Sequence, residues 1–187
     1  MPKKNMNNAQ LDSCIRRLAQ GDRDSFHTLY NISKDSVFLF ALSIVKNYYT
    51  AEDVLQESML HIAASAKNYK PNTNPKAWIF SITRNICLDV LKSASRKDIP
   101  LDEVQDSIQV NDNAYLALEA TKDVMEALQV LSQQEREIIS LYIFAGLRQT
   151  EIANTIQIPY VRVRSQYRYA LKKLRIYYEQ KEGFLYD

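Results

Sequence analysis

The stretch "EIANTIQIPYVRVRSQYRYALKKLR", Glu151 to Arg175, predicts two helices joined by a short turn around Gln157 to Pro159. The second helix carries six basic residues and no acidic one, although the whole chain has a formal net charge of only +2. A short helix, a tight turn and a basic second helix form the helix-turn-helix arrangement. In that arrangement the start of the second helix contacts base edges in the major groove of DNA.

Helical periodicity separates this second helix into two faces. At 100° per residue, an arc of roughly 100° collects the apolar core candidates: Val163, Tyr167, Ala170, Leu171, Leu174 and Tyr178. The rest of the surface collects the DNA-binding candidates, which are Arg162, Arg164, Ser165, Gln166, Arg168, Tyr169 and Lys172. Taken alone, this face also fits a solvated charged surface on a structural helix. The turn has Gln157 where such turns often carry glycine.

Composition favours an all-α protein and offers no chemistry for an enzyme. Three glycines in 187 residues, with 46% hydrophobic residues, argue against a turn-rich β fold and against glycine-rich phosphate loops. No apolar run reaches about 18 residues, so we expect no membrane span. Cys14 and Cys87 stand far apart, and His27 and His61 have no neighbour at ligand spacing. We expect free thiols in a reducing cytoplasm, no metal or other cofactor, and no catalytic activity.

Charge divides the chain into three parts. Residues 101–137 hold nine acidic residues, opposed only by Lys122 and Arg136. The segment around Pro100 is rich in Asp and Asn and lacks a helical period, which predicts a flexible acidic linker. We therefore expect two small helical domains, at residues 8–95 and 116–180, joined by a linker at 96–115.

The first domain should contain a helix with an acidic ridge. "RDSFHTLYNI" and "SVFLFALSIVKN" predict two helices, and "TAEDVLQESMLHIAASAKNY" predicts a third, capped by Thr50 with Asp53 as its partner. "AWIFSITRNICLDVLK" is apolar almost all round and should be central. Opposite the apolar face of the third helix lie Glu52, Asp53, Gln56 and Glu57.

A loop and the helix after it form a second candidate surface for DNA. The loop combines cations, amides and an aromatic side chain without any acid: Lys67, Tyr69, Lys70, Asn72, Asn74 and Lys76. The polar positions of the next helix are Ser81, Arg84, Asn85 and Lys92. Such a set suits single-stranded DNA, whose backbone attracts cations and whose bases stack on aromatic rings. Trp78 is expected in the core, whereas the role of Tyr69 is open between core and base contact.

Three motifs together resemble one family. "LSQQEREIISLYIFAGLRQTEIANTIQIPYVRVRSQYRYALKKLR" resembles region 4 of the extracytoplasmic-function (ECF) sigma factors, small members of the sigma-70 family of RNA polymerase sigma factors. "TAEDVLQESMLHIA" and "PKAWIFSITRNICLDVLK" resemble their region 2, in the same order. Ile62 and Ala63 depart from the aromatic end of the acidic motif, and Arg162 and Gln166 depart from the reading helix.

The resemblance implies a role for each surface. The ridge Glu52 to Glu57 would dock on the clamp helices of core RNA polymerase. The loop from Lys67 to Lys76 and the following helix would recognise and open the −10 promoter element. The basic helix would read the −35 element. An anti-sigma factor is a further possible partner.

Other interpretations remain open from the residues alone. A stand-alone helix-turn-helix regulator would bind duplex DNA as a dimer without polymerase, but it leaves the acidic ridge unexplained. A pure adaptor protein leaves the arginine stripe unexplained. The acidic linker could cross a basic polymerase channel or mask the basic helix, a hypothesis that rests on Asp102, Glu103, Asp106 and Asp112.

Overall fold

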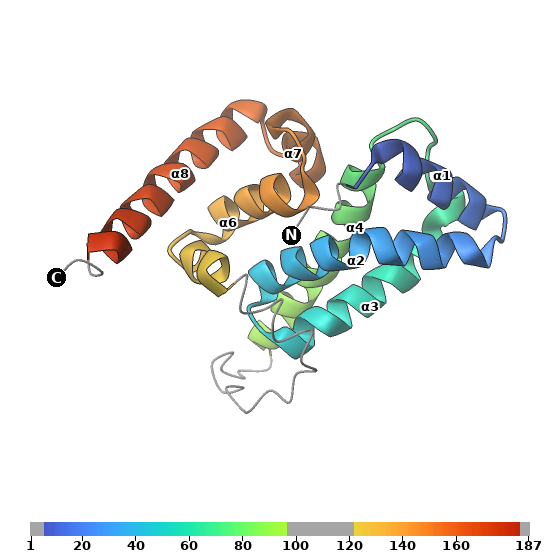
Figure 1. Ribbon diagram of the computed structural model, residues 1–187, viewed down its shortest axis with the longest axis horizontal. Coiled ribbons are helices and arrows are strands. Elements are labelled where there is room, and N and C mark those ends of the chain that lie inside the picture. The colour runs from blue at the N-terminus through green and yellow to red at the C-terminus, as the bar shows by residue number, and fades with distance from the viewer. Residues whose placement is uncertain (1–5, 97–121, 184–187) are drawn as a thin grey trace.

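A computed structural model describes residues 6–96 and 122–183, and all regular structure in these residues is helical (Figure 1). The helices of the N-terminal half are α1 (Asn8–Ala19), α2 (Arg23–Val45), α3 (Tyr48–Ser65), η1 (Ala66–Asn68) and α4 (Pro75–Arg96). The C-terminal half contains a helical stretch at 122–129, α6 (Gln133–Ser140), the single π-turn η2 (Leu141–Ala145), α7 (Gln149–Ile156) and α8 (Tyr160–Gly183).

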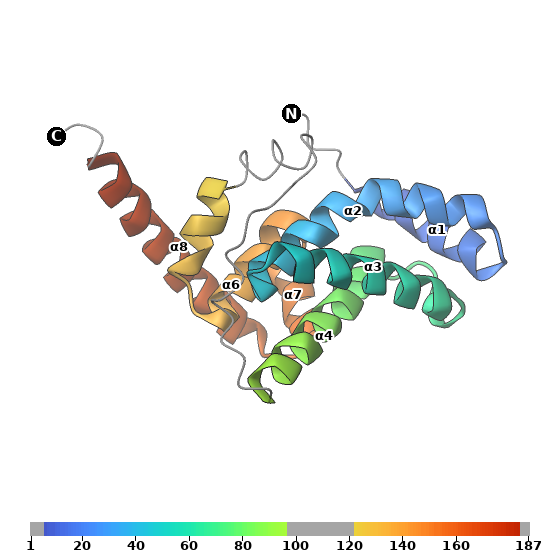
Figure 2. The same ribbon diagram turned by 90° about the horizontal axis from the view of Figure 1, so that it is seen from below.

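The N-terminal half is a bundle in which α2, α3 and α4 pack on one another, with α1 alongside α2 (Figure 2). Phe40 of α2 and Phe80 of α4 are fully buried and meet edge to face, with 5.4 Å between ring centroids. Edge-to-face contact is a favoured geometry for aromatic pairs. The centre of this bundle therefore fixes α4, as its apolar sequence predicts.

The C-terminal half begins with a cap and ends with the helix-turn-helix. Ser132 and Glu135 form the predicted capping box at the start of α6, each side chain bonding the other's backbone N–H. The buried Arg136 donates to the carbonyl oxygens of Leu128 and Leu131, which fixes the end of the preceding helix against α6. The segment ends at Gly146, as predicted, in a left-handed conformation with φ of +65°.

The turn between α7 and α8 is made by Gln157. This residue adopts φ of +56°, and its N–H donates to the carbonyl oxygen of Ala153. A side chain larger than glycine therefore occupies the left-handed position, where β-carbon crowding normally disfavours it. Pro159 precedes α8 and leaves the first turn of that helix unobstructed.

The two halves share one apolar core in this structure. Ile138 of α6 and Leu141 of η2 belong to the same buried cluster as Phe40 and Phe80. Helices α6 and η2 pack on α2, and α7 packs on α4. The predicted linker, 96–115, lies outside the described residues except for Arg96, which ends α4.

Three local predictions were wrong. The first two predicted helices are one continuous helix, α2, in which the buried Ser33 hydroxyl donates to the carbonyl oxygen of Leu29 instead of interrupting the helix. Helix α3 begins two residues before Thr50, because the Asn47 side chain accepts from the Thr50 N–H at 2.9 Å and acts as the cap.

The third wrong prediction concerns the far end of α8. Leu171 and Tyr178, placed on the core face by periodicity, are 45% and 39% exposed. The helix runs past α6 (Figure 1), and Lys181 in its last turn pairs with Asp123 and Glu126 of the stretch 122–129 at the surface. Val163 and Ala170 of the same predicted face are fully buried.

The two cysteines, Cys14 and Cys87, are buried free thiols, as predicted. Burial raises the pKa of the Cys87 thiol to about 12, so this group stays protonated in the physiological pH range. Within 6–96 and 122–183, every helix is too short or too polar to span a lipid bilayer.

Candidate functional site

Helix α3 presents the predicted acidic ridge. Its apolar face is buried through Ala51, Val54, Met59 and Ile62. On the other side Asp53, Gln56 and Glu57 are exposed, while Glu52 is half-buried and accepts a hydrogen bond of 3.0 Å from the Tyr48 hydroxyl. The ridge is therefore a surface of two exposed carboxylates and an amide on a firmly packed helix.

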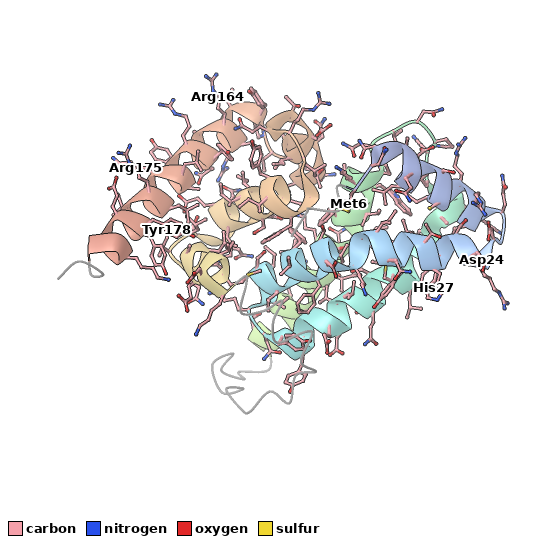
Figure 3. All side chains as sticks on the ribbon, viewed as in Figure 1. Met6, Asp24, His27, Arg164, Arg175 and Tyr178 are labelled. Carbon is pink, nitrogen blue, oxygen red and sulfur yellow. The ribbon has the colours of Figure 1, made fainter. Side chains whose placement is uncertain are left out.

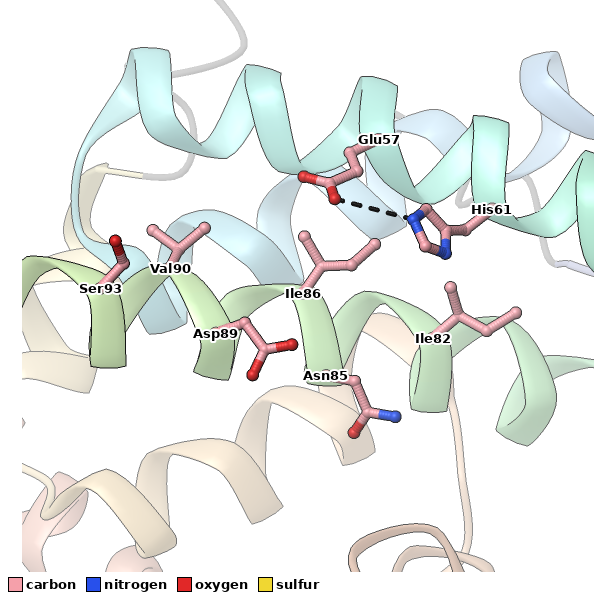
Figure 4. A pocket seen from close by; sticks show the side chains of 8 residues that line it. All are labelled: Glu57, His61, Ile82, Asn85, Ile86, Asp89, Val90 and Ser93. Carbon is pink, nitrogen blue, oxygen red and sulfur yellow. Dashed lines mark ion pairs between the residues drawn. The ribbon is translucent and has the colours of Figure 1, made fainter.

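A groove of about 370 Å³ lies beside this ridge, between α3 and α4 (Figure 4). Glu57 forms its α3 wall, and its carboxylate lies 3.7 Å from the His61 imidazole. Helix α4 contributes three apolar side chains that are spaced one helical turn apart: Ile82, Ile86 and Val90. Sequence reasoning missed this row because α4 is apolar on several sides, and periodicity does not show which apolar side stays open.

The loop after α3 separates the predicted DNA-contacting residues. Lys67, Lys70 and Asn72 are exposed. Tyr69, which the sequence left open, is only 6% exposed, and its ring lies 5.1 Å from that of Trp78. Its hydroxyl donates to Asp12 at 2.8 Å. The prediction that Tyr69 contacts DNA directly does not fit this position, because a buried, bonded ring has no face for a base.

The polar residues of α4 point in different directions. The Ser81 hydroxyl donates to the Trp78 carbonyl oxygen within its own helix. Asn85 lines the α3–α4 groove with Glu57 (Figure 4). Arg84 forms an ion pair with Glu137 of α6. The predicted −10 residues of this helix therefore do not form one surface in this arrangement.

The start of α4 also lies near the C-terminal half. The ammonium of Lys76 lies 3.6 Å from the position that a β-carbon on Gly146 would take. With the Arg84–Glu137 pair, two of the predicted −10 cations lie against α6 and η2. Farther along α4, Lys92 is paired with Asp89 at 3.4 Å on its own helix.

Helix α8 is fixed to α6 by its buried residues and by an ion pair. Lys173 donates to the buried Glu135 at 2.7 Å. Burial raises the pKa of Glu135, but the bonds from Lys173 and Ser132 outweigh it and hold that pKa below its ordinary value. Lys173 is thus a structural cation, and Arg175 likewise pairs with Glu179 at 2.7 Å.

The other predicted residues of α8 form an exposed cationic face. Arg162, Arg164, Arg168 and Lys172 are exposed, and none has an acidic partner within 6–96 and 122–183. Figure 3 shows Arg164 on the outer side of the helix. Tyr169 is 61% exposed, whereas Ser165 and Gln166 are half-buried, with the Ser165 hydroxyl bonded to the Arg162 carbonyl oxygen. Guanidinium groups that keep their donors free are suited to phosphate oxygens.

Family comparison agrees with this geometry. Residues 29–97 match Sigma-70 region 2, and residues 127–175 match Sigma-70, region 4. The chain belongs to the sigma-70 family. The two matches together cover more than half of this sigma-70 family chain, in the order that the sequence motifs predict. The first includes the ridge and α4, and the second includes α7, the turn and α8 as far as Arg175.

Relatives of similar length support the same family. The chain is 24% identical over 178 residues to an ECF RNA polymerase sigma factor, SigK, of Mycobacterium sp. (strain KMS), covering 88% of this chain and 89% of the relative.

Two solved structures share the fold. One is the structure of CnrH in complex with the cytosolic domain of CnrY, with a TM-score of 0.69, 18% identity and coverage of 91% and 98% of the two chains. The other is the sigma factor RpoE in complex with the anti-sigma factor NepR from Bartonella quintana, with a TM-score of 0.63, 21% identity and coverage of 80% and 94%.

Proposed function

We propose that this sigma-70 family member is an alternative sigma factor of the ECF type, which binds core RNA polymerase and directs initiation at promoters of a particular sequence. The observation that carries the proposal is the combination, in one chain, of an exposed acidic ridge on α3 with the exposed cationic face of α8. The first has the charge and shape of a protein-docking surface, and the second has those of a DNA-reading helix.

The mechanism combines docking on polymerase with contacts to two promoter elements. The ridge of α3 and the groove beside it dock on polymerase, and the loop after α3 with α4 contacts the −10 element. Helix α8 contacts the −35 element. Because one polymerase-bound chain carries both DNA-contacting surfaces, binding to one promoter element makes binding to the other effectively intramolecular. Neither DNA contact then needs to be tight by itself.

The binding energy is used to open DNA. Unstacking and extruding a base costs a few kcal/mol, which the −10 surface must offset by holding the single strand. The chain supplies positioned cations, amides and backbone groups for this, and the proposal assigns it no bond-making or bond-breaking step. We place this activity in the bacterial cytoplasm, where polymerase and promoter DNA meet.

A stand-alone regulator fits these surfaces less well. It would use α8 alone and would need a dimer to read two half-sites. It gives no role to the exposed Asp53, Gln56 and Glu57, nor to the region 2 match at residues 29–97.

An inhibitory partner belongs to the proposal as well. The similar RpoE structure contains an anti-sigma factor, and the structural similarity extends over most of both chains. We expect this chain to be held inactive by such a protein until its release.

Co-elution with bacterial core RNA polymerase on a size-exclusion column tests the proposal. The wild-type chain should co-elute, and Glu57→Lys should abolish co-elution because it reverses the charge where the ridge borders the groove between α3 and α4. Asp35→Lys is the matched control, since Asp35 is an exposed carboxylate of another helix, α2, and it should co-elute normally.

Failure of the wild-type chain to co-elute, together with tight binding to duplex DNA alone, would favour the stand-alone regulator. Equal loss in both variants would show a general charge effect instead of a docking surface.

A further inference from the structure

The carboxylate of Asp12 in α1 accepts hydrogen bonds from the loop that follows α3. Asp12 is only 9% exposed and lies outside both ranges that match sigma-70 regions. One carboxylate oxygen accepts from the Tyr69 hydroxyl at 2.8 Å and from the Asn72 backbone N–H at 2.9 Å. The other oxygen lies 3.1 Å from the Arg16 guanidinium.

These bonds act on the part of the loop that bears the exposed polar groups. Asn72 adopts a left-handed conformation, with φ of +61°, which is uncommon for residues other than glycine. The Asn72 N–H is the donor that Asp12 accepts, so the carboxylate is bonded at the unusual residue itself. The loop is thereby tied to α1 at its sharpest turn.

Two more bonds complete the loop's geometry. The Thr73 hydroxyl donates to the Lys70 carbonyl oxygen at 2.7 Å, and the Asn74 side chain accepts from the Ala77 N–H at the start of α4. Residues Lys70 to Thr73 are nevertheless all exposed. The backbone is therefore fixed while its side chains remain available to a ligand.

Asp12 and Tyr69 keep the protonation states that their hydrogen bond requires. The bond from Tyr69 is the main cause that lowers the pKa of Asp12, against the effect of burial. Burial, with the bond to Asp12, raises the pKa of Tyr69 to about 12. The carboxylate therefore stays charged and the phenol stays a donor throughout the physiological range.

We propose that Asp12 is a positioning residue for −10 recognition: with Tyr69 it holds the loop 70–74 in the shape that receives single-stranded promoter DNA. Tyr69 contributes through this support and not by stacking on a base. A loop that is ordered before binding loses less conformational entropy on binding, so its base discrimination is sharper. This inference rests on the proposed function, because it assumes that the loop contacts the −10 strand.

The test measures promoter discrimination by run-off transcription with core polymerase. The template is a promoter that the wild-type chain uses, compared with versions that carry single substitutions in the −10 or the −35 element. Asp12→Ala should reduce −10 discrimination about tenfold, as expected for lost hydrogen bonds to a charged group, and should leave −35 discrimination unchanged.

Three further variants separate positioning from simple stability. Tyr69→Phe keeps the ring on Trp78 but removes one bond, so it should give a smaller loss of −10 discrimination. Asp12→Asn keeps an acceptor oxygen for the loop and should retain most of the discrimination. Arg16→Gln removes the ion pair but neither loop bond, and it should behave as wild type.

Each outcome decides the inference. Normal −10 discrimination in Asp12→Ala and Tyr69→Phe, both folded and co-eluting with polymerase, would overturn it. If Asp12→Ala does not fold, Tyr69→Phe decides the matter. If the wild-type chain neither co-elutes nor initiates, the proposed function fails first, and the −10 role of Asp12 fails with it.

Discussion

Helices α4 and α8 both carry arginines that the sequence assigns to DNA, but the structure places them in opposite settings. Arg84 of α4 is mostly buried and paired with Glu137 of the other half of the chain. Arg164 and Arg168 of α8 are exposed, with no acidic partner in the described part of the chain. Arginine is thus bonded to another part of the protein on α4 but exposed to solvent on α8.

This difference separates two kinds of DNA contact. We expect the exposed cationic face of α8 to bind duplex DNA without rearrangement. We expect the α4 face that carries Arg84 to be less available to DNA, because the Arg84 Nε–H is already bonded to the Glu137 carboxylate of α6. We expect the free chain to bind DNA through α8 first.

The largest effect is expected from removing two cations of the available face. The double variant Arg164→Ala, Arg168→Ala should weaken duplex binding about 50-fold at 0.1 M salt, and should reduce the salt slope by about two, as counterion release predicts for two phosphate contacts. Titration of duplex DNA at several salt concentrations measures both quantities.

Its matched control is the double variant Lys173→Ala, Arg175→Ala. It removes the same charge from the same helix, but from side chains already paired with Glu135 and Glu179. An equal loss of affinity in the control would show that net charge, and not the exposed face, is responsible.

A smaller and more selective effect is expected at the start of α8. Arg162→Ala should change the preferred base at one or two −35 positions by about tenfold, the usual value of a bidentate base contact. Competition between the preferred −35 sequence and its single substitutions, in the presence of polymerase, measures this.

Gln166→Ala should act in the same way at a neighbouring −35 position. Arg164→Ala should instead weaken all sequences alike. If Arg162→Ala also weakens every sequence equally, Arg162 is a phosphate contact and the reading-helix assignment of this residue is wrong.

The smallest effect is expected at the ion pair between Arg84 of α4 and Glu137 of α6. Glu137→Gln replaces a charged partner of Arg84 by a neutral one, so it should raise the affinity of the free chain for single-stranded DNA about fivefold, close to the net value of a typical hydrogen bond. Glu126→Gln is the control, because Glu126 pairs with Lys181 of α8, away from α4. Equal rises in both variants would argue against a specific block by Glu137.

Features that depend on near neighbours in the chain were predictable. The capping box at Ser132, the turn at Gln157 and the buried face of α3 each follow from residues within one or two helical turns. Local residue types and periodicity are sufficient for these because the physical contacts are themselves local.

Features that depend on distant contacts were not predictable. Tyr69 bonds to a carboxylate 57 positions away, and Arg84 pairs with a carboxylate 53 positions away. Periodicity tells which side of a helix is polar, but not what that side meets. The sequence therefore left Tyr69 open between core and base contact and placed Arg84 on a DNA surface, whereas the fold bonds Tyr69 to Asp12 and pairs Arg84 with the C-terminal half.

The most direct test of the account is run-off transcription from a library of randomised promoters, with core polymerase and this chain. The account predicts transcripts that depend on the chain, from promoters sharing two separated elements, with the upstream preference altered by Arg162→Ala and the downstream preference altered by Asp12→Ala. The absence of chain-dependent transcripts would contradict it, and so would transcripts whose promoters share only one element.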